Sequence, residues 1–178
     1  MVQLIPFEEK DKCFFLDFIT QNEWPFHGNG KVDREKAQKW WEKGTYIGDE
    51  VRSYWIDSQG ERFGFVRLFE FSLDEEDEIP LFDIRLASKR RRAGVGSAAI
   101  KELTRIVFTE LGKRRLEGYT RIDNKAMRRV FEKNLFVKEA HLRQSWPIGD
   151  GNYVDTVGYA IIKSDWEKGV VTPPDWSS

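Results

Sequence analysis

The sequence of 178 residues has little cysteine, no clear surplus of either charge and no long apolar run. The single cysteine, Cys13, rules out an internal disulfide framework and suits a reducing compartment. Its setting, DKCFFLDF, predicts a buried thiol on a helix. Lys and Arg total 29 against 30 Asp and Glu, for a net charge of −1. The basic surplus typical of nucleic-acid-binding proteins is missing, so no nucleic-acid partner is expected.

Two further scarcities narrow the function. No apolar stretch approaches the roughly 18 residues that a membrane-spanning helix needs, and the N-terminus lacks the basic start and apolar run of a signal peptide. No membrane partner is therefore expected, and we predict a cytoplasmic protein. The two histidines, His27 and His141, stand far apart with no metal-ligand spacing, so no metal site is predicted.

Apolar periodicity and turn residues divide the chain into elements in the order α-α-β-β-β-α-β-α-β-β, which is an α+β arrangement. Helices are predicted for residues 8–20, for 34–44 after the N-cap candidate Asp33, for about 97–112, and for about 125–134 after Asn124. Strands are predicted for residues 51–57, 62–71, 79–87, 115–121, 137–146 and 153–162. We find no internal repeat or linker.

Residues 89–97, KRRRAGVGS, place four consecutive cations in front of two glycines and a helix. The first N–H groups of a helix have no intrahelical partner and carry partial positive charge, and glycine lets a bulky anion approach them. The segment therefore predicts a phosphate-binding loop, with a solvated basic turn as the bland alternative. A Walker A loop is excluded, because the glycines are too close together and no Lys follows. A dinucleotide fingerprint is met formally by Gly94, Gly96 and Ala99, but three strands with hairpin spacing precede it.

A third pattern, [QR]-x-x-G-x-[GA], is satisfied by residues 91–96 and resembles the pyrophosphate loop of the GNAT superfamily of acyl-CoA-dependent N-acyltransferases. The order of elements matches that fold from about residue 3 to 167. RIDNKAMRRVFEKNLFVKEA is similar to another family segment, with Asn124, Glu132, Lys133 and Phe136 in place. YVDTVGYAIIKSDW resembles the closing strand of the branch that includes the ribosomal-protein alanine acetyltransferases.

The resemblance implies a mixed, mostly antiparallel sheet of about six to seven strands flanked by about four helices. It also implies one domain over residues 1–178, with a short polar tail from about 168. The implied acyl donor is acetyl-CoA, with no metal. Its pantetheine arm would lie along the strand that contains Ile84, Arg85 and Leu86, like an added strand. The other residues implied in cofactor binding are Arg91, Arg92, Ala93, Gly94, Val95, Gly96, Ser97, Asn124 and Phe131.

The sequence departs from the family pattern at two positions that affect the mechanism. Many relatives have a Tyr that protonates the leaving thiolate, and here that position is Phe131. Members often have a basic Glu early in the fourth strand, where Leu81 stands here. Asp83 lies two residues further on and would project from the same face, so it is the first candidate for the base. An ion pair with Arg85 is the alternative role of its carboxylate.

The second candidate base is His27, in WPFHGNG, because histidine side chains in general titrate near neutral pH. Packing beside its aromatic neighbours is the alternative. His141 is expected in the core or on the surface. The side chains of Trp24, Trp40, Trp41 and Trp146 could build an aromatic acceptor pocket, although Trp40 and Trp41 cannot share one helix face.

These residues predict an N-acetyltransferase that moves an acetyl group from acetyl-CoA to a primary amine by direct attack. The acceptor could be a protein N-terminus or a small-molecule amine, and the chain is expected to be a monomer or homodimer. A non-catalytic CoA-binding or sensing module is the alternative, because Phe131 and Leu81 remove two expected catalytic groups. The acidic residues 74–78 could attract a cationic amine, but a solvated hairpin tip explains them as well.

Overall fold

The computed structural model describes residues 1–28, 30–72, 77–90 and 94–177. Seven strands form one sheet in the order β1-β2-β3-β4-β5-β7-β6, antiparallel except between β4 and β5. The strands are β1 (Val2–Pro6), β2 (Arg52–Ser58), β3 (Glu61–Phe69), β4 (Leu81–Leu86), β5 (Arg115–Arg121), β6 (Val137–Gly149) and β7 (Asn152–Ile162). The α-helices are α1 (Lys12–Gln21), α2 (Arg34–Glu42), α3 (Val95–Thr109), α4 (Lys125–Lys133) and α5 (Lys163–Lys168), with short 3-10 turns at η1 (Glu9–Asp11) and η2 (Ser88–Arg90).

The α+β class and the mostly antiparallel sheet are confirmed, and two elements go beyond the prediction. Strand β1 pairs with the outer edge of β2, and α5 follows β7 directly. The predicted burial of Cys13 is wrong. Helix α1 begins at Lys12 and turns four apolar side chains to the core, so Cys13 falls on the outer face and is exposed. No helix in the described part of the chain is long and apolar enough to cross a membrane.

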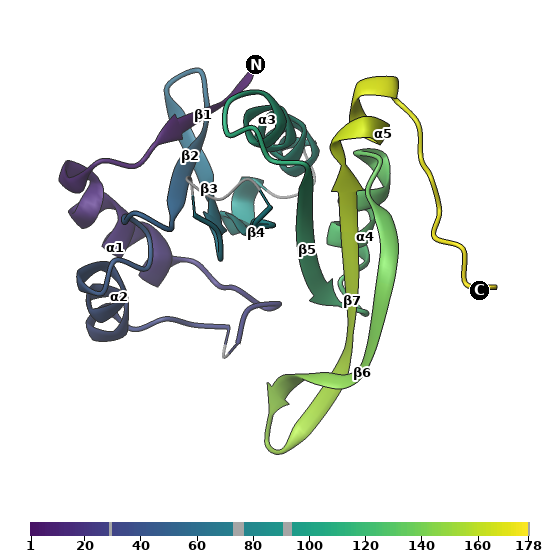
Figure 1. The fold of residues 1–178 in the computed structure, drawn as a ribbon. Coiled ribbons are helices and arrows are strands. Elements are labelled where there is room, and N and C mark those ends of the chain that lie inside the picture. Colours follow the sequence, from purple (N-terminus) through teal and green to yellow (C-terminus); the bar gives the residue numbers. More distant parts are fainter. Residues whose placement is uncertain (29, 73–76, 91–93, 178) are drawn as a thin grey trace.

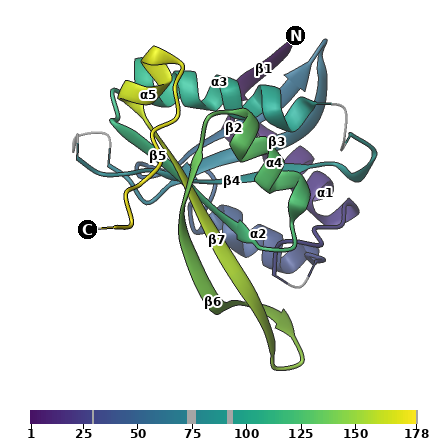
Figure 2. The same cartoon turned by 90° about the vertical axis from the view of Figure 1, so that its right-hand side faces the viewer.

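Alternating side chains of β2 and β3 build two separate cores. Trp55 and Phe65 belong to the apolar cluster formed with α1 and α2, whereas Ile56 and Val66 belong to the cluster formed with α3 and α4. Figures 1 and 2 show α1 and α2 together on one side of β2 to β4, with α3 on the other side. The side chains of β3 and β4 that point toward α1 and α2 therefore share a face with the loop that joins these helices.

Strands β4 and β5 run parallel but pair only at Leu81 and Glu117 within the described residues. Beyond that pair no hydrogen-bonded pairing of the two strands follows among the described residues, and aromatic rings pack against β5 instead. A Cβ atom on Gly118 of β5 would lie 2.7 Å from the rings of both Phe82 and Phe131. The two strands are thus held apart at the end of β4, which leaves a break in the sheet where a molecule could enter.

The β6–β7 hairpin extends beyond the rest of the molecule (Figures 1 and 2). The register of the β6–β7 ladder shifts between Leu142 and Trp146 and again between Pro147 and Gly149. Such irregularities bend a strand and re-aim its side chains. Trp146 is half-buried although its neighbours on β6 are exposed. It points back toward the break between β4 and β5.

Candidate active site

The loop between α1 and α2 is held by hydrogen bonds that fix the position of His27. The buried Trp24 donates its indole N–H to the carbonyl of Ile19 at 2.8 Å. The backbone of Trp24 also accepts from the N–H of His27 at 2.9 Å, and the N–H of Gly30 bonds to the carbonyl of His27 at 3.1 Å. The imidazole therefore leaves the loop from a braced turn, and its Nε2 lies 2.8 Å from Oδ1 of Asp83.

Asp83 on β4 receives two bonds from opposite sides. His27 contacts Oδ1, and Nε of Arg85 donates to Oδ2 at 3.1 Å. Burial of the carboxyl would raise its pKa, but the charges of Arg85 and His27 outweigh burial and hold the pKa of Asp83 well below its usual value. The carboxylate is therefore ionised throughout the neutral range. If Nε2–H donates to Asp83, Nδ1 of the imidazole keeps a lone pair and can accept a proton.

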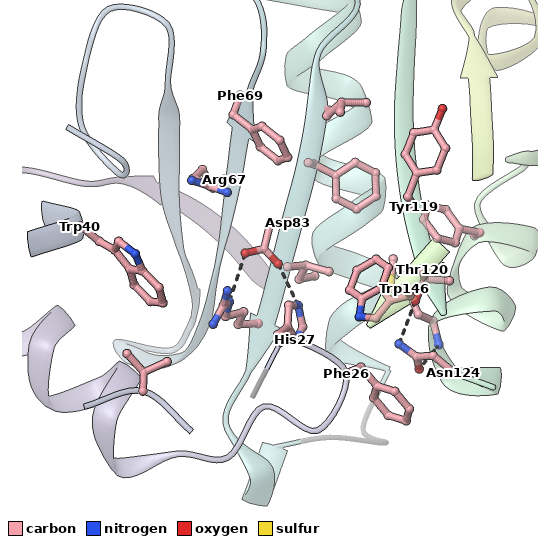
Figure 3. Close-up of a pocket in the computed structure, with 18 of the residues that line it drawn as sticks. Phe26, His27, Trp40, Arg67, Phe69, Asp83, Tyr119, Thr120, Asn124 and Trp146 are labelled. Atoms are coloured by element: carbon pink, nitrogen blue, oxygen red, sulfur yellow. Dashed lines mark hydrogen bonds and ion pairs between the residues drawn. The ribbon is translucent and has the colours of Figure 1, made fainter. Parts of the chain in front are cut away.

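The two residues predicted as alternative bases thus form one hydrogen-bonded pair, and the ion pair with Arg85 exists beside it. Figure 3 shows Asp83 and His27 at the centre of a pocket, with Arg67 and Trp40 on one side and Tyr119 and Trp146 on the other. This pocket, which we call the Arg67 cavity, has a volume of about 440 Å³. Its aromatic wall consists of Phe26, Trp40, Phe69, Phe82, Tyr119, Phe131 and Trp146.

A second hollow, which we call the Gly94 groove, has a volume of about 510 Å³ and lies between β4, the start of α3 and α4. Gly94 caps α3 with a φ of 76°, a left-handed conformation that favours glycine. The helix begins at Val95, two residues earlier than predicted. Gly96 packs closely on β4, because a Cβ there would come within 3.3 Å of Leu86. The first turn of α3 thus presents its N–H groups to the groove.

The edge of β4 beside the Gly94 groove exposes backbone as well. Ala87 donates its N–H to the carbonyl of Phe63, which fixes the alternation of the β3–β4 ladder. In that alternation the N–H and C=O of Ile84 point away from β3 and toward the break in the sheet. An extended molecule with amide groups can pair with this edge.

The Arg67 cavity and the Gly94 groove meet. The residues that line both are Phe26, His27, Ile84, Arg85, Asn124 and Met127. His27 is the single imidazole among them, so its ring is reachable from either side. The Asp83–His27 pair therefore stands at the junction of two hollows, where two molecules could meet beside one proton acceptor.

The remaining predicted cofactor residues fall into three groups. Arg91, Arg92 and Ala93 lie outside the described residues, as do positions 74–76 of the acidic stretch. Val95 turns its side chain into the core, so only its backbone faces outward. Ser97 and Asn124 line the Gly94 groove, and Asn124 also caps α4 by accepting from Met127 N–H at 3.2 Å. Helix capping and a place in the groove are therefore compatible roles for Asn124.

Phe131 is fully buried and stacks on Tyr159, with ring centroids 4.7 Å apart and planes only 2° from parallel. It also packs against Phe82 on the core side of the break between β4 and β5, and its phenyl ring has no proton to donate. His141 lies on the exposed hairpin and bonds to Asp155 at 2.7 Å, away from both hollows. Of the four tryptophans considered for a pocket, Trp40 and Trp146 line the Arg67 cavity, whereas Trp41 and Trp24 are core residues.

Two cations that the sequence analysis did not assign to cofactor binding face the Gly94 groove. Arg129 and Lys133 stand one helical turn apart on α4 and line the groove together with Gly94 and Ser97. No carboxylate lines the groove among the described residues. The sequence did carry a signal, because Arg129 and Lys133 are four residues apart in the helix predicted after Asn124, and residues i and i+4 share a helix face. The groove is thus positively charged from α4 as well as from the start of α3.

No group of three or more His, Cys, Asp or Glu residues in the described ranges could hold a metal ion. The donors that converge on the two hollows are instead backbone N–H groups, guanidinium groups and one imidazole. Such a set suits a phosphate-bearing molecule on one side and proton transfer at the junction.

A family model described as an acetyltransferase (GNAT) domain matches residues 2–137. Among solved structures, spermidine N-acetyltransferase from Vibrio cholerae in complex with CoA and spermine is similar, with 20% identity, a TM-score of 0.77, and coverage of 93% of this chain and 98% of that chain. Mutant forms of the spermidine/spermine N-acetyltransferase SpeG from the same organism give 20% identity, a TM-score of 0.75, and coverage of 95% and 99%. A dodecameric structure of spermidine N-acetyltransferase from Vibrio cholerae in an intermediate state gives 20% identity, a TM-score of 0.73, and coverage of 93% of this chain and 95% of that chain. A sequence search of curated proteins finds no match.

Proposed function

The chain belongs to the GNAT family of acetyl-CoA-dependent N-acetyltransferases, and we propose that its acceptor is a small-molecule primary amine, with His27 as the base. One observation carries the proposal: Asp83 holds the imidazole of His27 at the junction of the Arg67 cavity and the Gly94 groove. An amine in the cavity and a thioester reaching in from the groove would both lie next to this ring.

The residues of the Gly94 groove fit acetyl-CoA. The N–H groups at the start of α3 and the cations Arg129 and Lys133 would bind its phosphates. The open backbone of Ile84 would pair with the amides of its arm. When bound, acetyl-CoA supplies the activated acetyl group as a thioester.

The acceptor amine must lose a proton before it can attack, and His27 is placed to accept that proton. An alkyl amine with a pKa of about 10.4 is almost entirely protonated at pH 7 and cannot attack. We assign the removal of that proton to Nδ1 of His27. Asp83 is then a positioning residue and not the base, because its pKa is lowered and both its oxygens are bonded. Its carboxylate fixes the imidazole tautomer, as in other Asp–His pairs.

His27 can also take over the acid role that a tyrosine has in many relatives. The amine nitrogen forms a bond to the acetyl carbon, the carbon–sulfur bond breaks, and the sulfur leaves as a thiolate. His27 lines the groove as well as the cavity, so the proton that it takes from the ammonium group can pass to that sulfur, and the second proton that the nitrogen loses as the amide forms goes to solvent. A free thiol has a pKa of about 8.5, and its thiolate leaves without strong acid assistance. Phe131 is left with a packing role.

Two finer expectations accompany the proposal. The assignment to the branch of the ribosomal-protein alanine acetyltransferases stays a prediction, as does the monomeric or dimeric state. The cavity volume of about 440 Å³ favours a small acceptor over a protein N-terminus, because cavities of this size typically enclose a small molecule.

The test compares CoA binding and turnover in wild type, Gly94→Asp and Gly94→Asn. A side chain begun at Gly94 meets no described atom within 4 Å, so the two variants differ mainly in charge. We expect the aspartate to weaken CoA binding by about 10- to 100-fold relative to the asparagine, through repulsion of the phosphates. Calorimetry gives the affinity, and release of free CoA thiol in the presence of amines gives the turnover.

Equal affinities of the two variants would overturn the placement of the phosphates. Tight CoA binding by wild type, with no thiol release on any amine, would favour the alternative of a CoA-binding module.

A further inference from the structure

The charged side chains around the Arg67 cavity are strongly unbalanced. Among the described residues that line it, the cations are Lys31, Lys36, Arg67 and Arg85, and the one carboxylate is that of Asp83. Arg85 is paired with Asp83, and Lys31 with a glutamate that does not line the cavity. Lys36 lies over the ring of Trp40 at 5.2 Å. The cavity therefore presents positive charge to whatever occupies it.

Arg67 is the cation most firmly fixed in this wall. Its Nη1 donates to the backbone carbonyl of Thr45 at 3.0 Å, and its guanidinium lies 4.4 Å from the centre of the Phe69 ring and 5.3 Å from that of Tyr46. None of these three contacts supplies an anion. Its Nε is buried and has no hydrogen-bond partner among the described residues. Buried donors in folded proteins are normally satisfied, so this guanidinium has fewer bonds than usual, and a partner from outside the chain can reach it only where the side chain lines the cavity.

Asp83 does not fill that role. It stands directly opposite Arg67 in the β3–β4 ladder, but its Oδ1 is bonded to His27 and its Oδ2 to Arg85. The charge of Arg67 also helps to lower the pKa of Asp83, but both carboxylate oxygens are bonded to other residues, so Arg67 is left as a fixed, half-buried guanidinium beside the reaction centre. A planar guanidinium with free donors is the group that proteins use to bind a carboxylate in a two-pronged contact.

From this arrangement we propose that the acceptor carries a carboxylate, bound by Arg67, together with its primary amine and an aromatic or apolar body. The inference rests on the proposed acetyl transfer and names the substrate class of that same site. The aromatic side chains of Trp40, Phe69 and Trp146 receive the body. The acceptor's carboxylate would offset the excess of positive charge in the wall.

The spacing limits the acceptor further. Arg67 and Asp83 are register partners on adjacent strands, which lie about 4.8 Å apart, and both side chains are on one face. His27 is bonded to Asp83, so the base lies beside the register partner of Arg67. A compact acceptor, with its amine and carboxylate separated by a few bonds, suits two groups placed so close together. An α- or β-amino acid with an apolar side chain has this form.

The same wall disfavours a polyamine. Spermidine carries several positive charges and would place them beside Arg67, Arg85 and Lys36, while the single carboxylate among the described lining residues is already bonded. Like charges brought together in a partly buried site repel strongly. This chain thus has a pocket whose charge opposes the substrate named for its solved structural neighbours.

The experiment measures kcat/KM by CoA thiol release for four amines. Phenylalanine, phenylalaninamide and phenethylamine share one amine and one ring, and only phenylalanine has the carboxylate. Spermidine tests an acceptor with several positive charges. We expect phenylalanine to exceed phenylalaninamide and phenethylamine by about 10- to 100-fold, as is typical when a charged hydrogen-bond partner is lost. Spermidine is expected to be the poorest of the four.

Arg67→Met should abolish this preference by lowering kcat/KM for phenylalanine about 10- to 100-fold, mainly through KM. The affinity for CoA, which is measured by calorimetry and depends on the Gly94 groove, reports that the variant is folded. Arg67→Lys, which keeps the charge but not the planar fork, should restore part of the loss. Arg143→Met removes a guanidinium from the exposed hairpin, away from the cavity. It should leave kcat/KM unchanged for phenylalanine and for phenethylamine.

A calorimetric titration with phenylalanine and phenylalaninamide at saturating CoA separates this inference from the acetyl transfer itself. Binding of the acid that Arg67→Met removes, with no thiol release, would support the anion site and contradict the proposed function. Turnover of phenethylamine or spermidine equal to or above that of phenylalanine would leave acetyl transfer standing and overturn the anion site. An unchanged preference in Arg67→Met would overturn it as well.

Discussion

Replacing His27 by glutamine should remove the base and leave both hollows in place. The side chain of glutamine is similar in length and can still donate to Asp83, but it cannot accept a proton at neutral pH. Asp83 is a poor substitute, because its pKa is lowered and its oxygens are bonded to Arg85 and to the residue at position 27. No other imidazole lines either hollow within the described ranges. The variant must therefore rely on the small fraction of amine that is already neutral.

That dependence sets the size of the effect and its change with pH. An amine with a pKa of about 10.4 is neutral in only ~1 of 2,500 molecules at pH 7 and in ~1 of 25 at pH 9. General bases typically contribute a factor of about 10² to 10⁴. We therefore expect His27→Gln to lose about 10²- to 10³-fold in kcat/KM at pH 7. The loss should shrink to about 25-fold or less at pH 9, with the logarithm of the variant's rate rising by about one for each pH unit.

The assay follows CoA thiol release with an alkyl amine between pH 6 and pH 9.5. His141→Gln is the matched control, because His141 also bonds to an aspartate but lies on the exposed hairpin. It should behave as wild type. A His27→Gln enzyme with wild-type activity at pH 7, or an equal loss in His141→Gln, would refute the reasoning.

Three further results are expected. Arg129→Glu should weaken CoA binding in calorimetry, and more at low than at high salt, whereas Lys125→Glu at the start of the same helix should not; equal effects would contradict the assignment of the groove. Asp83→Asn should have a lower free energy of unfolding than wild type at neutral pH, and this difference should shrink as the pH falls. Urea unfolding at several pH values measures it. The lowered pKa of Asp83 contributes stability that is present above about pH 3.9 and lost as the pH falls through the folded value; a deficit constant down to pH 2 would argue against it. Gly118→Ala should lower the free energy of unfolding by about 1–3 kcal/mol, because its Cβ would lie 2.7 Å from the Phe131 ring; an unchanged melting temperature would contradict this packing.

The fold was largely predictable because long periodic segments carry it. The two missed elements carry little such signal. β1 spans only Val2–Pro6 and ends in proline, and it is stabilised by pairing with β2, a tertiary contact. α5 spans six residues, Lys163–Lys168, too few for a helical period to emerge. Cys13 was misplaced because three apolar residues follow it, and only the true start of α1 decides which face turns inward.

The site shows where sequence reasoning ends. Both candidate bases were identified by residue type, but the contact between His27 and Asp83 joins positions 56 residues apart. It depends on the turn braced by Trp24 and on the face that β4 presents to α1 and α2. The charge of the acceptor pocket was equally hidden. Arg67 sits in an alternating strand like any surface residue, and only the tertiary structure shows that it borders the cavity without a carboxylate partner among the described residues.

The most direct measurement supplies wild type and His27→Gln with acetyl-CoA labelled in the acetyl group, in the presence of phenylalanine or phenethylamine. Labelled N-acetyl product and free CoA thiol are counted together by mass spectrometry and thiol titration. We predict one labelled amide per thiol for wild type at pH 7, and less than about 1% of that rate for the variant. Thiol release without labelled amide, or equal amide formation by both proteins, would contradict acetyl transfer to an amine with His27 as the base.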